Sequence, residues 1–476
     1  MNKAFISFLI LLSGFQMNGQ SFEQFINHLN ALPETQRQAV ADSFLNATHS
    51  FPYTENDTLV HFIYSAAAQS VAMAGDATGW NPDRNLTHVG GCNFWYYSTS
   101  YEADARLDYK LVINGANWIL DPRNPFTCAG GYGPNSELRM PEYTVPPEIS
   151  YYSNLPHGII KDTIFQSSHL GNSRHVRVYL PPGYPEGSVS YPVVLFHDGL
   201  EYLSLCNGNN ILDYLIANHL ILPLIGVFVP PVDRTEEYAG SKIDNFTDFI
   251  IRELMPVIDA KYRTSADPSK RAMVGASNGG NIALYIGMKH PEIFGKIAAQ
   301  SSNILATISS TFATGPKLNL ALYIDIGSYD IPVLIPMVNG FKDILQAKDY
   351  TFQYREWHEG HSWGNWKGHL KLPLMQFFPW SSGLNDQSPD PRIKLEQNRP
   401  NPFHGHTVIP FSAPVNSEIE LTLVDLSGRN VETLFSGSVS VSENTLEYYH
   451  KKPAGQYILT LKQGKIFKDS MIIQAL

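Results

Sequence analysis

The fold is decided by one stretch near the middle of the chain, Arg271-Ala272-Met273-Val274-Gly275-Ala276-Ser277-Asn278-Gly279-Gly280. Its first part is apolar, as in a buried strand, and a helical pattern of apolar residues runs from Ile282 to Met288. The G-x-S-x-G between them predicts a sharp strand-to-helix turn that carries Ser277 above a sheet edge. Small residues at this turn let the strand and the helix approach each other. The alternative is a glycine-rich turn with a structural role only.

Residues 148–384, which surround this stretch, alternate β-branched runs with helical patterns. The expected strands are Arg174–Tyr179, Val193–Phe196, Leu224–Val229, Arg271–Val274, Ile297–Ala299, Leu320–Ile324 and Tyr350–Arg355. The expected helices are Asn245–Lys261 and Gly279–His290. This alternation is typical of an α/β domain with a mostly parallel sheet.

A serine hydroxyl is a weak nucleophile unless a base takes its proton, so Ser277 needs an acid and a histidine later in the chain. Asp330 stands on the loop after the strand expected at 320–324, and it is the expected acid. Asp325 belongs to the end of that strand, where a structural hydrogen bond is expected of it. It is the reserve candidate.

The histidine is expected in Trp357-His358-Glu359-Gly360-His361-Ser362-Trp363, which follows the last expected strand. His361 comes after a glycine that frees the loop, and it is the expected base. His358 lies near the strand and His369 falls in the following helix, so both are expected to be surface or packing residues. The HEGH string lacks the i, i+4 spacing of H-E-x-x-H, and a glycine disfavours a helix there, so no metal is expected.

Acyl transfer also needs N–H donors for the charge that develops on the carbonyl oxygen, each worth about 3 kcal/mol of barrier. One is expected from the backbone of Asn278, directly after the serine. The other is expected from the loop Phe196-His197-Asp198-Gly199-Leu200, with the Leu200 N–H as the donor. The alternative for this loop is a plain tight turn.

Four motifs of the domain occur together: Phe196-His197-Asp198-Gly199, Asp233-Arg234-Thr235-Glu236-Glu237-Tyr238, Gly275-Ala276-Ser277-Asn278-Gly279-Gly280 and Glu359-Gly360-His361-Ser362-Trp363. Together they resemble the putative-esterase (esterase D-like) family, which includes enterochelin, feruloyl and acetyl-xylan esterases. The resemblance spans residues 162–378 and implies an α/β-hydrolase fold with a Ser–acid–His triad, although some members use Glu as the acid. Arg234 is a candidate for binding an anionic substrate group, or for a structural ion pair with Glu236 or Glu237.

The residues before this domain divide into two parts. Apolar side chains at helical spacing from Phe22 to Leu32 predict a helical lead-in over residues 21–58. Residues 59–147 show short strands with turn signals, typical of a small β-sandwich. The strands are expected at Leu59–Tyr64, Ser70–Ala74, Phe94–Ser98 and Tyr109–Ile113. Three runs in this part, Val71–Asp76 with Trp80, Asp108–Leu111 and Trp118–Pro122, resemble the early-set immunoglobulin-like domains related to glycogen-binding modules. That resemblance implies glycan binding or bracing of the catalytic domain.

The residues after the α/β domain begin with a polar, proline-bearing segment, 385–394, which indicates a linker. A second small β-sandwich is expected over residues 395–476, with strands at Ile419–Val424, Gln456–Leu461 and Ile466–Ile472. Its motifs are Asn398, Pro400-Asn401-Pro402-Phe403, Asp425-Leu426-Ser427-Gly428-Arg429 and Ala454-Gly455-Gln456-Tyr457. They resemble the C-terminal sorting domain of the type IX secretion system of Bacteroidetes. The resemblance implies transport by that machinery across the outer membrane, then release or attachment at the cell surface.

Residues 1–20 have a lysine near the start, an apolar run from Ala4 to Leu12 and small residues near Gly19. This is the pattern of a signal peptide, which is too short to anchor the chain stably, so the mature protein is expected to have no transmembrane anchor. Export permits a disulfide between Cys92 and Cys128, which the sequence leaves open, with Cys206 the third cysteine.

The net charge of -10, without any run of Lys or Arg, argues against a nucleic-acid partner. The motifs and resemblances together imply a secreted serine esterase, a carboxylic ester hydrolase that needs no cofactor. The first expectation is a carbohydrate esterase that releases feruloyl or acetyl groups from plant polysaccharide or oligosaccharide. The second is an esterase for enterochelin-like siderophores, and the third is a glycan-binding protein with a vestigial hydrolase domain.

Overall fold

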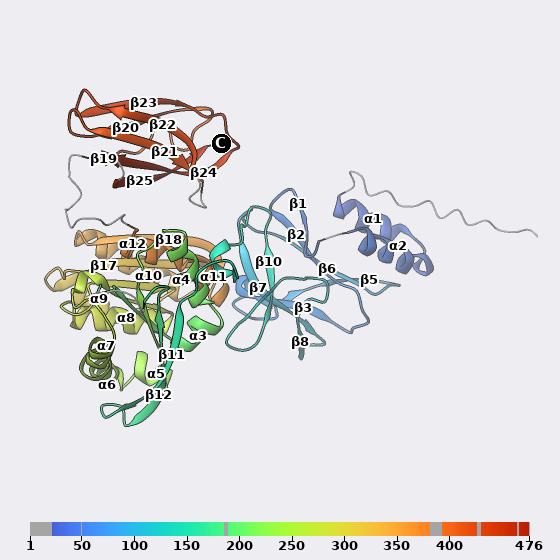
Figure 1. Cartoon of the computed structure of the whole chain (residues 1–476). Coiled ribbons are helices and arrows are strands. Elements are labelled where there is room, and N and C mark those ends of the chain that lie inside the picture. The colour runs from blue at the N-terminus through green and yellow to red at the C-terminus, as the bar shows by residue number, and fades with distance from the viewer. Residues whose placement is uncertain are drawn as a thin grey trace, which may run out of the picture.

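The computed structural model describes residues 21–48, 50–184, 189–380, 393–425, 430–463 and 466–475. They form an α/β domain, a β-rich front module and a C-terminal β-sandwich (Figure 1), which confirms the expected fold class. The expected signal peptide, most of the expected linker and residues 426–429 of the sorting motif lie outside the described residues. In the described part of the chain, no helix has the length and apolar character needed to cross a membrane.

The α/β domain is built on eight strands in the order β11-β12-β14-β13-β15-β16-β17-β18. Their bounds are β11 (Ile159–Ser167), β12 (Asn172–Leu180), β13 (Val193–His197), β14 (Ile225–Val229), β15 (Arg271–Ala276), β16 (Lys296–Gln300), β17 (Ala321–Tyr329) and β18 (Thr351–Gly360). From β14 to β18 all neighbours run parallel, whereas β11 and β12 are antiparallel. The seven strands expected from the sequence are confirmed, and β11 is an addition.

Helices cover both faces of this sheet, so its central strands are buried throughout. The helices are α3 (Gly199–Ser204), α4 (Gly208–Ala217), α5 (Arg234–Tyr238), α6 (Ile243–Asp248), α7 (Met255–Lys261), α8 (Asn278–Lys289), α9 (Ala306–Thr314), α10 (Leu334–Ala347), α11 (Trp363–His369) and α12 (Lys371–Phe377). Val193 and Leu195 pack in the apolar core shared with α6 to α10, while Val194 and Phe196 pack in the core shared with α3, α4, α11 and α12.

The helix expected at Asn245–Lys261 is interrupted by a π-helical segment, Phe249–Leu254, between α6 and α7. Pro256, in the first turn of α7, has no N–H for the carbonyl of Arg252, and its ring would clash with that carbonyl. The turn before the proline therefore widens.

The front module packs two sheets face to face. One has the order β1-β2-β6-β5, and the other contains β7, β10, β9, β3, β4 and β8. Their bounds are β1 (Tyr53–Glu55), β2 (Leu59–Tyr64), β3 (Val71–Gly75), β4 (Arg84–Asn85), β5 (Thr87–Val89), β6 (Phe94–Ser100), β7 (Arg106–Ile113), β8 (Asn117–Ile119), β9 (Thr127–Cys128) and β10 (Asn135–Arg139). The lead-in helices α1 (Phe22–Ala31) and α2 (Glu34–Ala47) cover the outer face of the first sheet, packing on Ile63 and Phe94.

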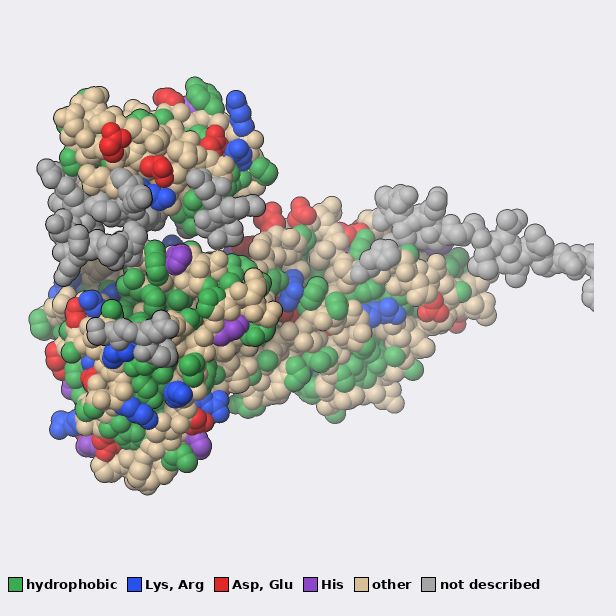
Figure 2. Space-filling model, viewed as in Figure 1, with side chains coloured by type: hydrophobic (Ala, Val, Ile, Leu, Met, Phe, Trp, Pro, Cys, Tyr) green, Lys and Arg blue, Asp and Glu red, His purple; other side chains and the backbone are tan. Residues whose placement is uncertain are grey.

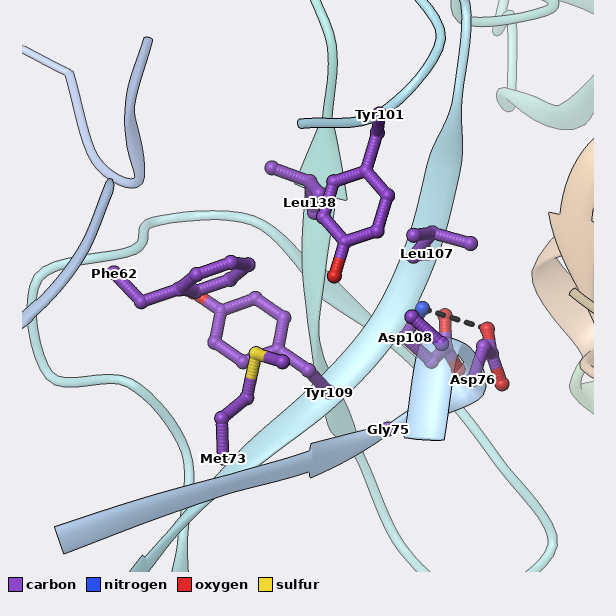
Figure 3. Close-up of a pocket in the computed structure, with 10 residues that line it drawn as sticks. Phe62, Met73, Gly75, Asp76, Tyr101, Leu107, Asp108, Tyr109 and Leu138 are labelled. Atoms are coloured by element: carbon purple, nitrogen blue, oxygen red, sulfur yellow. Dashed lines mark hydrogen bonds between the residues drawn. The ribbon is translucent and has the colours of Figure 1, made fainter. Parts of the chain in front are cut away.

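Between the two sheets lies a small cavity with room for about one water molecule (Figure 3). Phe62, Met73 and Tyr109 line one end of it. At the other end the N–H of Asp108 donates to the buried carboxylate of Asp76 at 2.8 Å. The second sheet continues past this point, because β7 pairs with β18 of the α/β domain.

The C-terminal module packs the sheet β19-β20-β23 on the sheet β22-β21-β24-β25. The bounds are β19 (Lys394–Leu395), β20 (His406–Ser412), β21 (Glu418–Val424), β22 (Asn430–Ser438), β23 (Glu443–Tyr449), β24 (Gly455–Gln463) and β25 (Ile466–Ala475). Cys92, Cys128 and Cys206 are all free and buried. On the face shown in Figure 2, basic and acidic side chains are interspersed over the α/β domain, and apolar side chains gather on the lower side of the front module.

Candidate active site

Ser277 stands at the junction of β15 and α8 in strained backbone geometry, with φ +57° and ψ -124°. A side chain at Gly275 would place its Cβ 2.1 Å from the carbonyl oxygen of Gly279, so the strand and the helix meet too closely for any other residue there. This is the sharp turn that the G-x-S-x-G pattern predicts, and it holds the serine at the carboxyl edge of the sheet.

Asp330 directly follows β17, and its carboxylate is within hydrogen-bond distance of His361. Oδ1 lies 2.7 Å from Nδ1 of the imidazole and accepts the N–H of Ile331 at 2.7 Å. The Asp330 side chain is fully buried, which protects this bond from water. The reserve candidate, Asp325, contacts Ser301 N–H and the Gln300 side chain instead, and burial raises its pKa to about 6. The structure therefore brings Asp330 rather than Asp325 to the histidine.

His361 directly follows β18, with 18% of its side chain exposed, and its ring meets the Trp366 ring edge-on at 5.0 Å. The other two histidines of this region are engaged elsewhere. His358 pairs with Asp104 of the front module at 2.6 Å, and His369 bonds to Glu359 at 2.7 Å. Among the described residues, no group of three or more His, Cys, Asp or Glu side chains is placed to hold a metal ion.

Ser277 and His361 lie at the same sheet edge, but within the described residues no hydrogen bond joins the serine hydroxyl to the imidazole. A short chain of contacts connects them. The Ser277 N–H donates to the Gln300 carbonyl at 2.9 Å, the Gln300 amide donates to the Trp366 carbonyl at 3.1 Å, and the Trp366 ring packs on His361. Catalytic hydrogen bonds of unliganded enzymes often form only when substrate binds.

The two expected oxyanion donors both lie at helix N-termini. Asn278 is the first residue of α8 and Leu200 is the second of α3. N–H groups in the first turn have no acceptor within their own helix, so both are available to an external oxygen. Asp198 turns the chain into α3 with φ +52°, and a Cβ at Gly199 would lie 2.2 Å from the Val229 nitrogen. The loop is thus more than a plain turn, because it holds a helix N-terminus closely against the sheet.

Arg234 links this loop to the serine turn. Its guanidinium binds both carboxylate oxygens of Asp198 at 2.8 Å and donates to the Ala276 carbonyl at 3.3 Å. The expectation of an ion pair with Glu236 or Glu237 is wrong, because Glu237 pairs with Arg174 and Glu236 binds Ser241.

These contacts of Arg234 favour a role in holding the Asp198 loop over a role in binding an anionic substrate group. Tyr238, from the same motif, also holds the loop, because its hydroxyl accepts the Asp198 N–H at 2.9 Å.

Residues 167–375 match the family model described as "Putative esterase". The chain is 30% identical over 151 residues to the uncharacterized protein YbbA of Bacillus subtilis, a match that covers 29% of this chain and 60% of that protein. It is 33% identical over 162 residues to an endo-1,4-beta-xylanase/feruloyl esterase of Xylanibacter ruminicola, covering 31% of this chain and 22% of that protein.

A solved structure shares a larger part of the fold. The enterobactin esterase FES from Shigella flexneri, in the presence of enterobactin, superposes with a TM-score of 0.60 at 20% identity, covering 71% of this chain and 97% of that one. The α/β domain from β11 to α12 is less than half of the 476 residues, so the shared fold extends beyond it. Together with the family match, this superposition supports an α/β esterase fold for the domain.

Sequence reasoning missed several residues that shape the site. The sequence predicts Asp198 only as part of the loop, whereas it anchors Arg234, and no sequence motif points to Gln300 or Trp366. Asp198 could have been noticed from its place beside a glycine at a strand end. Nothing local marks Gln300, because its role depends on α11 folding back over the sheet.

Proposed function

We propose that the chain is a serine esterase that works through an acyl-enzyme. The observation that carries the proposal is Ser277 at φ +57° between β15 and α8, at the sheet edge where Asp330 binds His361. Ser277 attacks the ester carbonyl while His361 accepts its proton and Asp330 orients the imidazole. The N–H groups of Leu200 and Asn278 hold the oxyanion, and His361 gives its proton to the alcohol as the C–O bond of the ester breaks. Water, activated by the same histidine, then hydrolyses the acyl-enzyme and frees Ser277 and the acid product.

The proposed substrates are feruloyl or acetyl esters of plant polysaccharide or oligosaccharide. Support comes from the resemblance to feruloyl and acetyl-xylan esterases and from the partial match to the Xylanibacter ruminicola protein. Loops that follow strands of the same sheet also expose apolar side chains that could contact an acyl group. Val232 is 58% exposed in the loop after β14, and Ile331 and Val333 are 44% and 62% exposed in the loop after β17.

A second candidate is hydrolysis of a siderophore ester of the enterochelin type. The observation that favours it is the superposition on enterobactin esterase FES, which reaches beyond the α/β domain. A third, a glycan-binding protein with a vestigial hydrolase domain, is disfavoured because Ser277, Asp330 and His361 are all present.

We further propose that the protein is exported and either released or held at the outer-membrane surface. The support is the signal-peptide pattern of residues 1–20 and the likeness of residues 395–476 to a type IX sorting domain. Fractionation of a bacterium that has this secretion system tests the proposal, since the full chain should reach the surface or medium and a chain ending at residue 394 should stay in the periplasm. Equal export of both chains would contradict it.

The enzymatic proposal is tested by covalent labelling and a substrate panel. A fluorophosphonate probe should label a peptide that contains Ser277, as read by mass spectrometry. The panel compares methyl ferulate, acetylated xylan and a tri-serine lactone, and the first two should be hydrolysed with the higher kcat/KM. Preference for the lactone would select the siderophore candidate, whereas glycan binding with no turnover of any ester and no labelling would select the third.

A further inference from the structure

One segment of the front module, residues 101–106, contacts both loops that carry the predicted acid and base. On the acid side, Tyr329 directly precedes Asp330. Its hydroxyl donates to Glu102 Oε2 at 2.7 Å, and its ring packs edge-on against Tyr101 with the centroids 5.6 Å apart. The acid therefore follows a residue whose side chain is held by the front module.

On the base side, Arg106 lies at the centre of the contact, fully buried. Its backbone lies opposite that of Glu359 where strand β7 pairs with strand β18. Its Nη1 donates to the Ser362 hydroxyl at 3.1 Å and lies 3.5 Å from Glu359 Oε2. Glu359 and Ser362 stand on either side of Gly360-His361, so the guanidinium links the two ends of the histidine loop.

Gly360 lets this loop lie directly against the front module. A Cβ built at position 360 would lie 2.0 Å from Cγ of Asp76, so the backbone rests on a buried carboxylate. Asp76 is fixed in turn by the N–H of Asp108 at 2.8 Å (Figure 3) and by the indole of Trp80 at 3.2 Å. Two hydrogen bonds therefore fix the carboxylate that lies under the loop.

Ser362 connects Arg106 to the helix that packs against the imidazole of His361. Its hydroxyl accepts from Arg106 and from the Asn365 N–H at 3.4 Å, which caps the start of α11. Trp366, the next residue of that helix, packs edge-on against the His361 ring. A displacement of Ser362 would therefore move the helical turn on which the imidazole rests.

We propose that Arg106 is a positioning residue for the reaction: by tying Glu359 and Ser362 to the front module, it holds His361 where Nδ1 meets Asp330. The inference rests on the proposed serine-esterase function. It makes the front module a structural part of the active site, in addition to any binding role of its own.

Two variants separate positioning from folding. Removing the Arg106 charge would leave Asp108 and Glu359 as buried carboxylates without an arginine partner and Glu137 with Arg139 alone, which endangers the fold. The test therefore uses Arg106→Lys, which keeps the charge but loses the planar fork of donors, and Ser362→Ala, which removes only the hydroxyl.

The matched control is Arg139→Lys. Arg139 pairs with Glu137 at 2.9 Å, but its ion pair stays within the front module. All variants are made in the full chain.

Three quantities are measured: kcat and KM on the best ester of the panel, Tm, and the far-downfield proton resonance of His361 Nδ1–H in protein labelled with ¹⁵N-histidine. We expect Arg106→Lys and Ser362→Ala to lower kcat about 10- to 100-fold, because small misplacements of a catalytic group have effects of that size. KM should stay within about twofold, since substrate binding is not changed. The downfield resonance should shift or broaden, and Arg139→Lys should match the wild type in all three.

Wild-type kcat in both variants, with an unchanged resonance, would overturn the positioning role. A lower kcat accompanied by a lower Tm, with the resonance unchanged, would also overturn it, because the variants would then act through stability alone. An inactive wild-type protein would instead refute the esterase function, and the resonance would then still report whether Arg106 holds the Asp330–His361 bond.

Discussion

Asp330 Oδ1 lies 2.7 Å from His361 Nδ1, although 31 residues separate the two in sequence. The bond forms because β17 and β18 are parallel neighbours, so residues that follow their carboxyl ends emerge side by side. Ser277 follows β15, two strands away in the same sheet. The order serine, acid, histidine along the chain is thus also their order across the sheet.

Replacing Ser277 with Ala should abolish ester hydrolysis, lowering kcat by roughly 10⁴- to 10⁶-fold, because the nucleophile is removed while the turn remains. Product release by the purified variant measures this. Ser310→Ala, an exposed serine of α9, is the control and should keep full activity. A Ser277→Ala protein as active as wild type would show that another group attacks the ester.

Replacing Asp330 with Asn should lower kcat by roughly 10³- to 10⁴-fold, because an amide cannot stabilise the imidazolium that forms on His361. Asp325→Asn, whose carboxylate contacts Ser301 and Gln300, should change kcat by less than about tenfold because it does not touch the histidine. Steady-state kinetics of the two variants compare these losses of kcat. The reverse ranking would transfer the acid role to Asp325.

Replacing Arg234 with Lys should lower kcat/KM about tenfold even on a neutral p-nitrophenyl ester, because a single ammonium cannot hold both oxygens of Asp198. The Leu200 N–H would then be less well placed for the oxyanion. Arg252→Lys, at an exposed pair with Asp248, serves as the control. If the loss were confined to KM and to anionic substrates, Arg234 would bind the substrate instead.

His197 is expected to make the stability of the fold depend on pH. It is fully buried beside Tyr238 and Phe246, and burial lowers its pKa from 6.5 to about 3. Between pH 6.5 and 3 the unfolded chain therefore binds a proton that the folded chain excludes, so stability is lost as the pH falls through this window.

His197→Phe should remove this loss. Between pH 7 and pH 4 its free energy of unfolding should fall by on the order of 3 kcal/mol less than that of the wild type. Urea denaturation at the two pH values measures the difference, and His175→Phe, at an exposed histidine, is the control. Equal losses in the wild type and His197→Phe would show that this imidazole is protonated in the fold.

Much of the α/β domain follows from local pattern. The strand before Ser277, the helix after it and the late placement of Asp330 and His361 are visible as periodicity and spacing, because hydrophobic alternation reports burial directly. The strained turn can also be predicted locally, because the glycines at 275 and 279 allow the strand and the helix to meet closely.

Contacts between distant segments could not be read in this way. The sequence offers Glu236 and Glu237 as ion-pair partners for Arg234, whereas its partner in the structure is Asp198, 36 residues away. The hydrogen bond from Arg106 to Ser362 spans 256 residues, and nothing in either neighbourhood signals the other. Such pairs depend on how whole elements pack, which local propensity does not encode.

The pairing of β7 with β18 makes one sheet run from the α/β domain into the front module. The charged side chains at this junction are buried, and Arg106 lies close to Glu359 across it. Separating the α/β domain from the front module would therefore part these charges from each other, instead of exposing a mainly apolar surface. Heating should therefore melt both bodies in a single cooperative transition. The C-terminal sandwich, with its own core, should unfold on its own.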